Sequence, residues 1–352
     1  MTSRRTASPV NVDVRVLVVN AGSSTLKLSL LDANDSELWA RELAAPRAVV
    51  EADAVATALA ALPASAEVAG HRVVHGGERF REAVVVDDGV EAELRELTAL
   101  APLHQPKSLA ALNAVTRALP NVPEVACFDT AFHATLPAEA ATYALPRAWR
   151  ARYGVRRYGF HGLSHAYADR AAGAARRVVT CHLGAGASLC AVLDGRSVDT
   201  TMGFTPLEGL VMATRSGSVD PGLLLWLQQH EGFTADEMAE ALDHESGLLG
   251  LAGTADMRQL LAREDADAQL ALGVYIHRLR AGIAAMVASL DGLDALVFTG
   301  GVGERAARVR ELACAGLSHL GVGTPGSAVR VLAVRAREDL EIARQARALL
   351  SE

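Results

Sequence analysis

The sequence predicts an α/β protein made of two related lobes, each with a mixed β-sheet flanked by helices. The chain has 352 residues, more than the roughly 250–300 at which a single hydrophobic core stops growing. A segment near the N-terminus has a counterpart near the middle of the chain, and each consists of two β-rich runs around a turn of small residues. Strand-like apolar runs alternate with helical periodicity along the rest of the chain.

Composition excludes several protein classes. The net charge is −7 and the isoelectric point is about 5.9, which argues against a nucleic-acid-binding surface. No run approaches the roughly 18–20 uncharged apolar residues of a membrane span, and residues 1–10 lack the features of a secretory signal. Four scattered cysteines without a metal-ligand spacing fit reduced thiols: Cys127, Cys181, Cys190 and Cys314. We therefore expect a cytoplasmic protein with no nucleic-acid or membrane partner.

The first predicted element is the hairpin "VLVVNAGSSTLKLSLLD" at residues 16–32, and "VVTCHLGAGASLCAVLDG" at 178–195 aligns with it without a gap. Small residues in such a turn allow backbone N–H groups to approach an anion closely. One Gly-rich hairpin is weak support for phosphate binding, but two copies predict two nests that close on a polyphosphate. The aligned positions pair Asn20 with His182, Gly22 with Gly184, Ser24 with Gly186, and Asp32 with Asp194.

The other elements follow in order. After an Ala-rich helical segment, the first lobe is expected to contain a strand and turn at 70–77, a strand at 83–88, helices at 90–100 and 109–118, and a strand from Glu124. The second lobe contains a helix at 161–174, the second hairpin, and a strand and turn from Ala295. A final helix at 338–351 returns to pack on the first lobe. The expected lobes are residues 1–129 with 336–352, and residues 130–335.

Nine motifs follow one another from end to end of the chain: "VNAGSSTLKLSL", "GHRVVHGGERF", "APLHQP", "FDTAFHATLP", "RRYGFHGLSH", "HLGAGASL", "TTMGFTPLEGLVMATRSGSVDPG", "SGLLGLAGTADMR" and "FTGGVGERAARVRE". In this order they resemble the motifs of the acetate kinase family, within the two-lobed phosphotransferases that include sugar kinases, actin and the heat-shock chaperone ATPases. The resemblance implies two ribonuclease-H-like lobes with a cleft between them. It also implies reversible in-line transfer of the ATP γ-phosphoryl group to acetate with Mg²⁺ or Mn²⁺, and a homodimer formed through the second lobe.

The resemblance assigns catalysis to Arg72, Asp129, His161 and Arg215. Guanidinium groups match carboxylate and phosphate oxygens in two-point contacts, and a histidine donor stabilises charge on a phosphoryl group in transfer. Without the motifs, each arginine would be assigned to the surface and Asp129 to a turn or helix cap. The i,i+4 pair of His161 and His165 could indicate zinc, but no third ligand has a suitable spacing, so a buried structural role is expected for His165.

The resemblance also assigns binding residues. Mg²⁺ would be held by Asn20 and Glu338, and the acetate methyl would lie among Val74, Leu103, Phe160 and Pro206. Because one methylene changes discrimination by only about 1–3 kcal/mol, acetate and propionate both stay open. The ATP/ADP residues would be Ser23, Thr25, Lys27, His182, Leu183, Gly184, Ala185, Gly186, Asp256, Met257, Arg258, Gly301, Val302, Gly303, Glu304 and Arg305.

Three departures from the family pattern are visible. Ala185 replaces the usual Asn of "HLGNG", and Gln105 with Lys107-Ser108 replaces the usual "NPAN" loop. The chain is also shorter than typical members between residues 31 and 68 and around 230–256. The rival functions are the same chemistry on propionate or butyrate, a nucleotide-binding protein that has lost catalysis, and a sugar kinase. The apolar pocket disfavours the sugar kinase, and the arginines disfavour lost catalysis; the sequence does not separate ATP from GTP or pyrophosphate as the donor.

Overall fold

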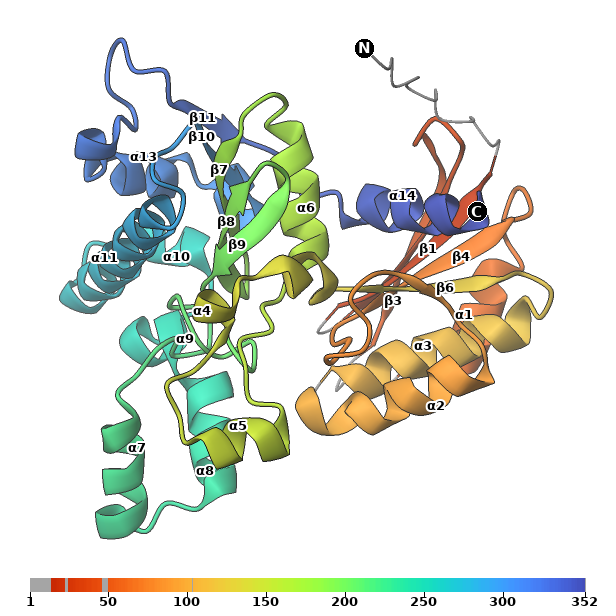
Figure 1. The fold of residues 1–352 in the computed structure, drawn as a ribbon, viewed down its shortest axis with the longest axis horizontal. Helices are drawn as coiled ribbons and strands as arrows, with labels where there is room; N and C mark the ends of the chain where they lie inside the picture. The colour runs from red at the N-terminus through yellow and green to blue at the C-terminus, as the bar shows by residue number, and fades with distance from the viewer. Residues whose placement is uncertain (1–13, 23–24, 46–49, 103, 352) are drawn as a thin grey trace, which may run out of the picture. The chain divides into compact units, whose positions relative to one another are not determined.

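The computed structural model describes residues 14–22, 25–45, 50–102 and 104–351. They form two compact units: one takes the described residues up to Ala131 together with those from Glu338, and the other runs from Phe132 to Arg337 (Figure 1). The predicted α/β class with two duplicated mixed sheets flanked by helices is confirmed. The roles predicted for the two lobes stay predictions.

The first unit is built on a six-stranded sheet in the order β3-β2-β1-β4-β6-β5. The first three strands are antiparallel neighbours, whereas β1, β4 and β6 are parallel. The carboxyl ends of β1, β4 and β6 therefore meet at one edge of the sheet. The strands are β1 (Val16–Ala21), β2 (Thr25–Leu31), β3 (Glu37–Ala44), β4 (Val68–Val73), β5 (Val84–Val85) and β6 (Glu124–Phe128).

Helices cover both faces of this sheet, which explains the unbroken apolar run of β1. Leu17 and Val19 pack with the helices α1 and α3 on one face, and α14 lies across the other (Figure 1). Gly70 makes the close approach of α14 possible, because a Cβ there would lie 2.6 Å from the Cγ2 atom of Ile342. The expected return of the last helix to the first unit is thus observed. The helices are α1 (Ala52–Leu59), α2 (Asp88–Glu96), the 3-10 turn η2 (Leu97–Leu100), α3 (Gln105–Ala118) and α14 (Glu338–Leu350).

The second unit repeats this topology. Its sheet has the order β11-β10-β7-β8-β9, and β7, β10 and β11 are parallel while β7, β8 and β9 are antiparallel. Reversed, this order matches β3-β2-β1-β4-β6 strand for strand, so the repeat extends beyond the hairpin. The strands are β7 (Arg177–Leu183), β8 (Ala187–Leu193), β9 (Arg196–Thr200), β10 (Ala295–Thr299) and β11 (Arg330–Ala333).

The two hairpins differ in pairing register. The strands β2 and β8 begin and end at equivalent positions of the two copies, as the gapless alignment predicts. However, Ala21 pairs with Leu26 in the first hairpin, whereas Leu183 pairs with Ala187 in the second. Four residues therefore separate the last paired positions of the first hairpin, and three separate those of the second.

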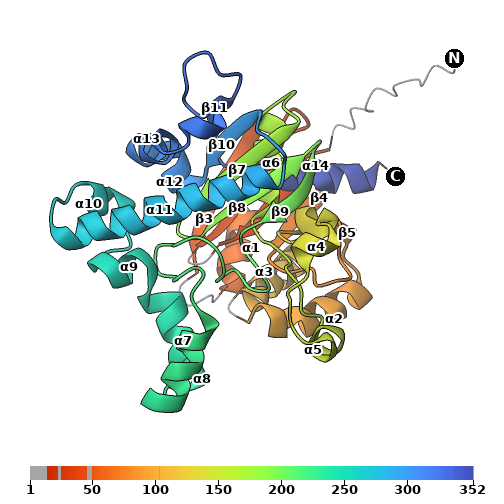
Figure 2. The same cartoon turned by 60° about the vertical axis from the view of Figure 1, so that its left-hand side comes forward.

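Helices also cover both faces of the second sheet. Ala168 and Ala172, at the C-terminal end of α6, pack with Cys190 of β8 on one face, and Gly282 of α11 faces Leu189 on the other (Figure 2). The helical elements are η3 (Ala131–Thr135), α4 (Ala138–Ala141), α5 (Arg147–Tyr153), α6 (Gly162–Ala171), α7 (Pro221–Trp226), η4 (Leu227–Glu231), α8 (Ala235–Glu240), η5 (Ala241–Glu245), α9 (Gly247–Ala252), α10 (Met257–Leu261), α11 (Ala266–Ala288), α12 (Gly300–Arg305), α13 (Ala307–Ala315) and η6 (Ser318–Leu320).

Within the described ranges, α11 is the one helix long and apolar enough to cross a membrane by length and composition. It instead packs against β8, α9 and α13, and it buries eight side chains, including Tyr275, Leu279 and Ile283. Arg280 of the same helix donates from Nε to the carbonyl of Leu312 at 3.0 Å. These contacts make α11 a core helix of the second unit.

Several predicted helix boundaries were inexact. The helix expected at 90–100 starts at Asp88, capped by the Asp87 carboxylate on Val90 N at 2.8 Å, and its last turn is the 3-10 segment η2. The helix expected at 109–118 begins four residues earlier, because Pro106 is suited to a first turn. The helix expected at 161–174 ends at Ala171, before Gly173 with a φ of +67°.

Candidate active site

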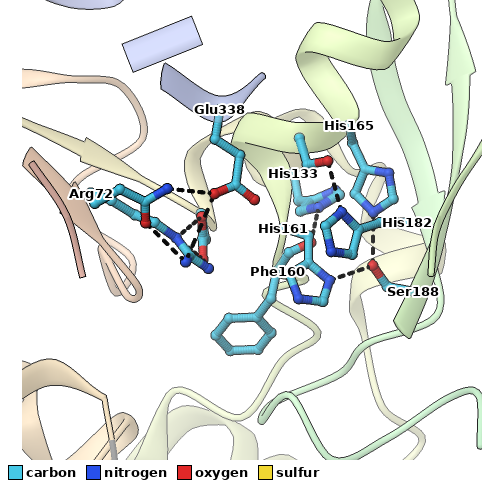
Figure 3. Close-up of polar contacts among 11 residues, drawn as sticks. Arg72, His133, Phe160, His161, His165, His182, Ser188 and Glu338 are labelled. Atoms are coloured by element: carbon cyan, nitrogen blue, oxygen red, sulfur yellow. Dashed lines mark hydrogen bonds and ion pairs between the residues drawn. The ribbon is translucent and has the colours of Figure 1, made fainter. Parts of the chain in front are cut away.

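Four polar side chains meet at the carboxyl ends of the parallel strands of the first unit. Asn20 lies on β1, Arg72 on β4, Asp129 directly after β6, and Glu338 at the start of α14. Because the three strands are neighbours, Asn20, Arg72 and Asp129 lie close together. The packing of α14 on the same sheet brings Glu338 to them. We call these four residues the Arg72 cluster (Figure 3).

The Arg72 guanidinium is the hub of this cluster. Its Nη2 donates to Asp129 Oδ2 at 2.6 Å, and its Nε donates to Asp129 Oδ1 at 3.1 Å. Its Nη1 donates to the amide oxygen of Asn20 at 3.3 Å and lies 3.9 Å from Glu338 Oε2. The guanidinium is therefore held in one orientation by three neighbouring elements.

Burial and charge act against each other in the Arg72 cluster. Asp129 is 1% exposed, and this burial raises its pKa while the Arg72 charge opposes the rise. Desolvation also disfavours the charge on Arg72, but Asp129 and Glu338 outweigh it and raise the pKa of the guanidinium. Arg72 consequently keeps its charge at every physiological pH.

The Arg72 cluster fits a hard divalent cation in the chemistry of its donors, since carboxylate and amide oxygens with water are what Mg²⁺ prefers. Asn20 donates from Nδ2 to Glu338 Oε2 at 2.9 Å while its oxygen faces Arg72. The amide must rotate if both residues are to present oxygen to one ion. Among the described residues no group of three or more His, Cys, Asp or Glu side chains could hold a metal, so water or phosphate oxygens would have to complete the coordination.

A second cluster lies in the second unit, around the start of α6. His161 is the residue before this helix and has a left-handed backbone, with φ of 56°. Such a conformation is costly for a residue other than glycine and is kept where the surroundings demand it. Gly159 must be glycine, because its Cβ would lie 2.6 Å from the ring of His133. The motif "YGFHG" therefore encodes a sharp backbone turn that sets the direction of His161.

His161, His165, His182 and Ser188 form what we call the His161 cluster (Figure 3). The Ser188 hydroxyl lies 2.9 Å from His161 Nδ1 and 2.8 Å from His165 Nε2. The rings of His161 and His182 stack at a centroid distance of 4.2 Å. His165 is fully buried, and burial holds its pKa well below the usual value, so the ring is neutral. The expected buried, hydrogen-bonded role of His165 is thus observed.

Arg215 joins the His161 cluster through the second hairpin turn. A Cβ added to Gly186 would lie 3.2 Å from His161 Nε2 and 3.5 Å from Arg215 Nη1, so both side chains approach this glycine closely. Arg215 Nη1 donates to the carbonyl of Pro206 at 3.0 Å, and Asp243 lies 3.9 Å from its Nε. Burial lowers the pKa of Arg215, and Asp243 opposes that effect.

Comparison with known proteins decides the family. The model of the Acetokinase family matches residues 48–344. The chain belongs to the acetokinase family. It is 47% identical over 304 residues to the acetate kinase of Nostoc punctiforme, covering 79% of this chain and 75% of that protein. It is 43% identical over 386 residues to the acetate kinase of Clavibacter michiganensis, covering 94% and 98%.

Solved structures agree with this family. The acetate kinase of Porphyromonas gingivalis matches with a TM-score of 0.87 at 33% identity, covering 96% of this chain and 100% of that one. A propionate kinase from Francisella tularensis matches with a TM-score of 0.86 at 32% identity, covering 95% and 99%. The predicted family and the phosphotransferase class are confirmed by these matches.

The residues expected to bind nucleotide in this acetokinase have varied surroundings. Thr25 accepts from Gly22 N through its backbone carbonyl at 2.9 Å and Lys27 is exposed, whereas Ser23 lies outside the described residues. Asp256 caps α10 at Arg258 N, and the two side chains also pair, with Arg258 Nη2 2.6 Å from Asp256 Oδ2. Residues 300–305 form α12.

Glu304 of α12 has a clear structural partner in this acetokinase. Its Oε1 accepts from the backbone N–H of Ala336 at 2.6 Å. Ala336 lies two residues before Glu338, so the carboxylate holds the segment that leads into α14. The assignment of Glu304 to the nucleotide side stays a prediction.

The four residues expected to line the acyl pocket belong to different parts of the chain. Val74 is buried in the first unit, whereas Phe160 and Pro206 belong to the second. The carbonyl of Phe160 accepts from His133 Nε2 at 3.0 Å, which fixes the backbone directly before His161. Leu103 lies outside the described residues. The pocket as a whole stays a prediction.

The sequence analysis did not predict the hydrogen bonds of Arg157 and Tyr143 that hold the loop carrying Pro206. Arg157 donates from Nη1 to the carbonyls of Thr201 and Met202, both at 3.0 Å, and from Nη2 to Glu208 Oε1 at 2.8 Å. The Tyr143 hydroxyl donates to Glu208 and accepts from Phe204 N at 3.0 Å. The two adjacent arginines that open the motif "RRYGFHGLSH", Arg156 and Arg157, were the available signal.

Proposed function

We propose that this acetokinase transfers the γ-phosphoryl group of ATP to acetate in one reversible, Mg²⁺-dependent, in-line step in the cytoplasm. The carrying observation is the Arg72 cluster, in which a fixed guanidinium and oxygen donors stand at the carboxyl ends of three parallel strands. Phosphoryl transfer needs alignment and charge stabilisation more than covalent chemistry. Such a site requires no covalent intermediate on the enzyme.

In this mechanism, Arg72 binds the acetate carboxylate and screens its charge from the phosphates. Asp129 orients Arg72 through three hydrogen bonds, so the guanidinium loses no rotational freedom when substrate binds. Mg²⁺ would be held by Asn20 and Glu338, with water and phosphate oxygens, and would neutralise phosphate charge. Mn²⁺ has similar preferences and is expected to substitute.

We assign His161 and Arg215 to the transferring phosphoryl group. Both approach Gly186 at the second hairpin turn, whose backbone N–H groups we assign to the nucleotide phosphates. Hydrogen-bond donors fixed where negative charge develops stabilise the transition state without reorganising. The remaining nucleotide contacts are assigned to Thr25, Lys27 and residues 182–186, 256–258 and 301–305.

Propionate is the second candidate acceptor. Val74 and Phe160 are both buried and apolar, and this chain is similar to a propionate kinase as well as to acetate kinases. One methylene changes discrimination by only about 1–3 kcal/mol. We therefore propose acetate as the preferred acid and propionate as a slower substrate.

We further propose a homodimer formed through the second unit. Five large apolar side chains of residues 219–233 are between 40% and 56% exposed: Val219, Leu223, Leu225, Trp226 and Phe233. Several large exposed apolar side chains within one short segment are typical of a protein interface.

The test is acyl-phosphate formation, trapped as the hydroxamate, from MgATP with acetate, propionate and butyrate in parallel. We expect the highest kcat/KM with acetate, and loss of product in Arg72→Ala and Arg215→Ala. GTP and pyrophosphate serve as alternative donors. Absence of product with every acid and donor, despite measurable ATP binding, would contradict the proposal, as would a phosphorylated His161 or Asp129 formed on the reaction path.

A further inference from the structure

We propose that Ser188 and His165 are positioning residues that keep the Nδ1 atom of His161 protonated and so commit its Nε2 atom to the phosphoryl group. This inference rests on the proposed role of His161. Neither residue was assigned to the mechanism above, and both lie in the core of the second unit.

The proposal depends on a chain of hydrogen bonds that starts at Ser188 on β8, whose side chain is 0% exposed. Its single hydroxyl lies within hydrogen-bond distance of two imidazole nitrogens, 2.9 Å from His161 Nδ1 and 2.8 Å from His165 Nε2 (Figure 3). A hydroxyl has one proton, so it donates to one ring and accepts from the other. The proton on His161 is therefore determined by the proton on His165.

The contacts of His165 and Thr180 determine in which direction these hydrogen bonds donate. His165 Nδ1 lies 2.7 Å from Thr180 Oγ1, and Thr180 donates in turn to the carbonyl of Cys190 at 3.5 Å. A carbonyl only accepts, so Thr180 accepts from His165 Nδ1–H. A neutral His165 then has a bare Nε2, which accepts from Ser188, and Ser188 accepts from His161 Nδ1–H.

The opposite direction satisfies fewer groups. If Ser188 donated to His161, then His165 would need its proton on Nε2 and Thr180 would have to donate to His165 Nδ1. The contact from Thr180 to the Cys190 carbonyl would be lost inside the sheet, where polar groups are expected to be paired. All three residues between His161 and this carbonyl are fully buried, so water does not replace the lost contact.

The outward nitrogen is the one placed for catalysis. A Cβ on Gly186 would lie 3.2 Å from His161 Nε2 and 3.5 Å from Arg215 Nη1. His161 Nε2 therefore faces the same turn as the Arg215 guanidinium. Because Ser188 accepts from Nδ1–H, a neutral His161 has no proton on Nε2. Nε2 donates to the phosphoryl group once the ring takes up a second proton, which the negative charge of that group favours. The stacked His182 ring restricts the tilt of the imidazole.

The same unit contains a matched comparison. Ser197 on β9 is also fully buried and lies 2.8 Å from His133 Nδ1, but His133 Nε2 is bound to the Phe160 carbonyl at 3.0 Å. Since the carbonyl only accepts, His133 carries its proton on Nε2 and Ser197 donates. The two serine–histidine pairs are thus expected to contain opposite tautomers.

The test uses the full-length enzyme with ¹⁵N-labelled histidine, read by long-range ¹H–¹⁵N correlation spectra that distinguish the tautomers. We expect Nδ1–H for His161 and Nε2–H for His133 in the wild type. Ser188→Ala should change the His161 tautomer signals and lower kcat by about tenfold or more, as loss of an orienting partner does, with KM for ATP within about twofold. Ser197→Ala, the control, should leave the His161 signals unchanged, and Ser188→Thr should restore them.

Two results would overturn the inference: Nε2–H at a neutral His161 in the wild type, or unchanged His161 signals and kcat in Ser188→Ala. Should Ser188→Ala not fold, Thr180→Val removes the far end of the chain with little change in volume, and unchanged His161 signals there would equally refute it. A wild-type enzyme with the expected tautomer but no kinase activity would instead contradict the proposed function. The two failures are therefore distinguishable.

Discussion

Arg72 and Asp129 are joined by three hydrogen bonds: Nη2 donates to Oδ2 at 2.6 Å, and Nε lies 3.1 Å from both Oδ1 and Oδ2. Arg72 lies on β4, and Asp129 directly follows the neighbouring parallel strand β6. Arg72 pairs with Cys127, and Asp129 N donates to the carbonyl of Val73 at 3.0 Å. The sheet itself therefore aligns the guanidinium with the carboxylate. The fixed guanidinium is the feature on which the proposed chemistry depends.

Asp129→Asn removes the charge while it keeps the shape. We expect kcat/KM for acetate to fall about 100-fold, because Arg72 loses its charged partner and the alignment it provides. The free energy of unfolding should fall by about 1–3 kcal/mol, since a buried guanidinium is left without its carboxylate. Steady-state kinetics and thermal melting measure both effects.

The control for Asp129→Asn is Glu67→Gln, which breaks the more exposed ion pair with Arg15. Exposed pairs contribute little, so this variant should match the wild type in both measurements. An Asp129→Asn enzyme with wild-type kcat/KM would show that the orientation of Arg72 does not limit catalysis.

Gly70→Ala tests the close packing of α14 against the sheet of the first unit. The new Cβ would lie 2.6 Å from Ile342 Cγ2, and such overpacking costs about 1–3 kcal/mol. Because Glu338 is the first residue of α14, we expect the displaced helix to raise the Mg²⁺ concentration needed for half-maximal activity as well as to lower the melting temperature. A Mg²⁺ titration of activity and a thermal melt are the measurements.

Ile342→Val is not a remedy, because it keeps the Cγ2 atom, whereas Ile342→Ala removes the clash. The double variant Gly70→Ala/Ile342→Ala should therefore recover Mg²⁺ dependence relative to Gly70→Ala alone. An unchanged Mg²⁺ requirement in destabilised Gly70→Ala would separate Glu338 from metal binding.

The sequence predicted the fold well where short-range patterns determine it. Gly-rich turns between β-rich runs revealed both hairpins, and the second strands of the two copies begin and end at equivalent positions. The alignment did not predict the pairing register of the hairpins, because the register depends on how each turn closes. Ala21 pairs with Leu26 in the first hairpin, but Leu183 pairs with Ala187 in the second. Alignment of letters cannot distinguish turns that differ in their hydrogen bonds.

The site was predictable in part for a similar reason. Asn20, Arg72 and Asp129 stand at strand ends, where parallel strands collect polar groups. Glu338 is 318 positions from Asn20, and only the family resemblance joined them. Ser188 gave no signal, since a serine within an apolar strand carries no pattern until its two histidine partners are known.

Gly186→Ala tests the convergence of His161 and Arg215. The new methyl would lie 3.2 Å from the His161 ring, which is tighter than ordinary packing, so that ring must shift by a few tenths of an ångström, and it would also touch Arg215 Nη1 at 3.5 Å, an ordinary contact distance. Because misplacement of about 1 Å can cost about 100-fold in rate, we expect kcat to fall about tenfold. Gly273→Ala, where an added Cβ meets nothing within 4 Å on α11, is the control and should keep wild-type kcat. Equal kcat in both variants would contradict the convergence.

Asp169 is expected to lower the stability of the fold as pH rises, whereas most carboxylates in folded proteins raise it. Burial raises its pKa from 3.8 to about 6. Between about pH 4 and 6 the unfolded chain is ionised at this residue while the folded chain still holds the proton, so this carboxyl lowers the stability as pH rises through that window. The side chain is only partly buried, so solvent reduces the expected loss to about 1 kcal/mol. Asp169→Asn should therefore gain about that much over the wild type at pH 7.5, with the gain shrinking toward zero at pH 4, in paired thermal melts. Asp194→Asn is the contrasting control, because the hydrogen bonds from Arg176 lower the pKa of Asp194 and its loss should give no gain at pH 7.5. A gain in Asp169→Asn that is the same at both pH values would show that packing, not ionisation, is responsible.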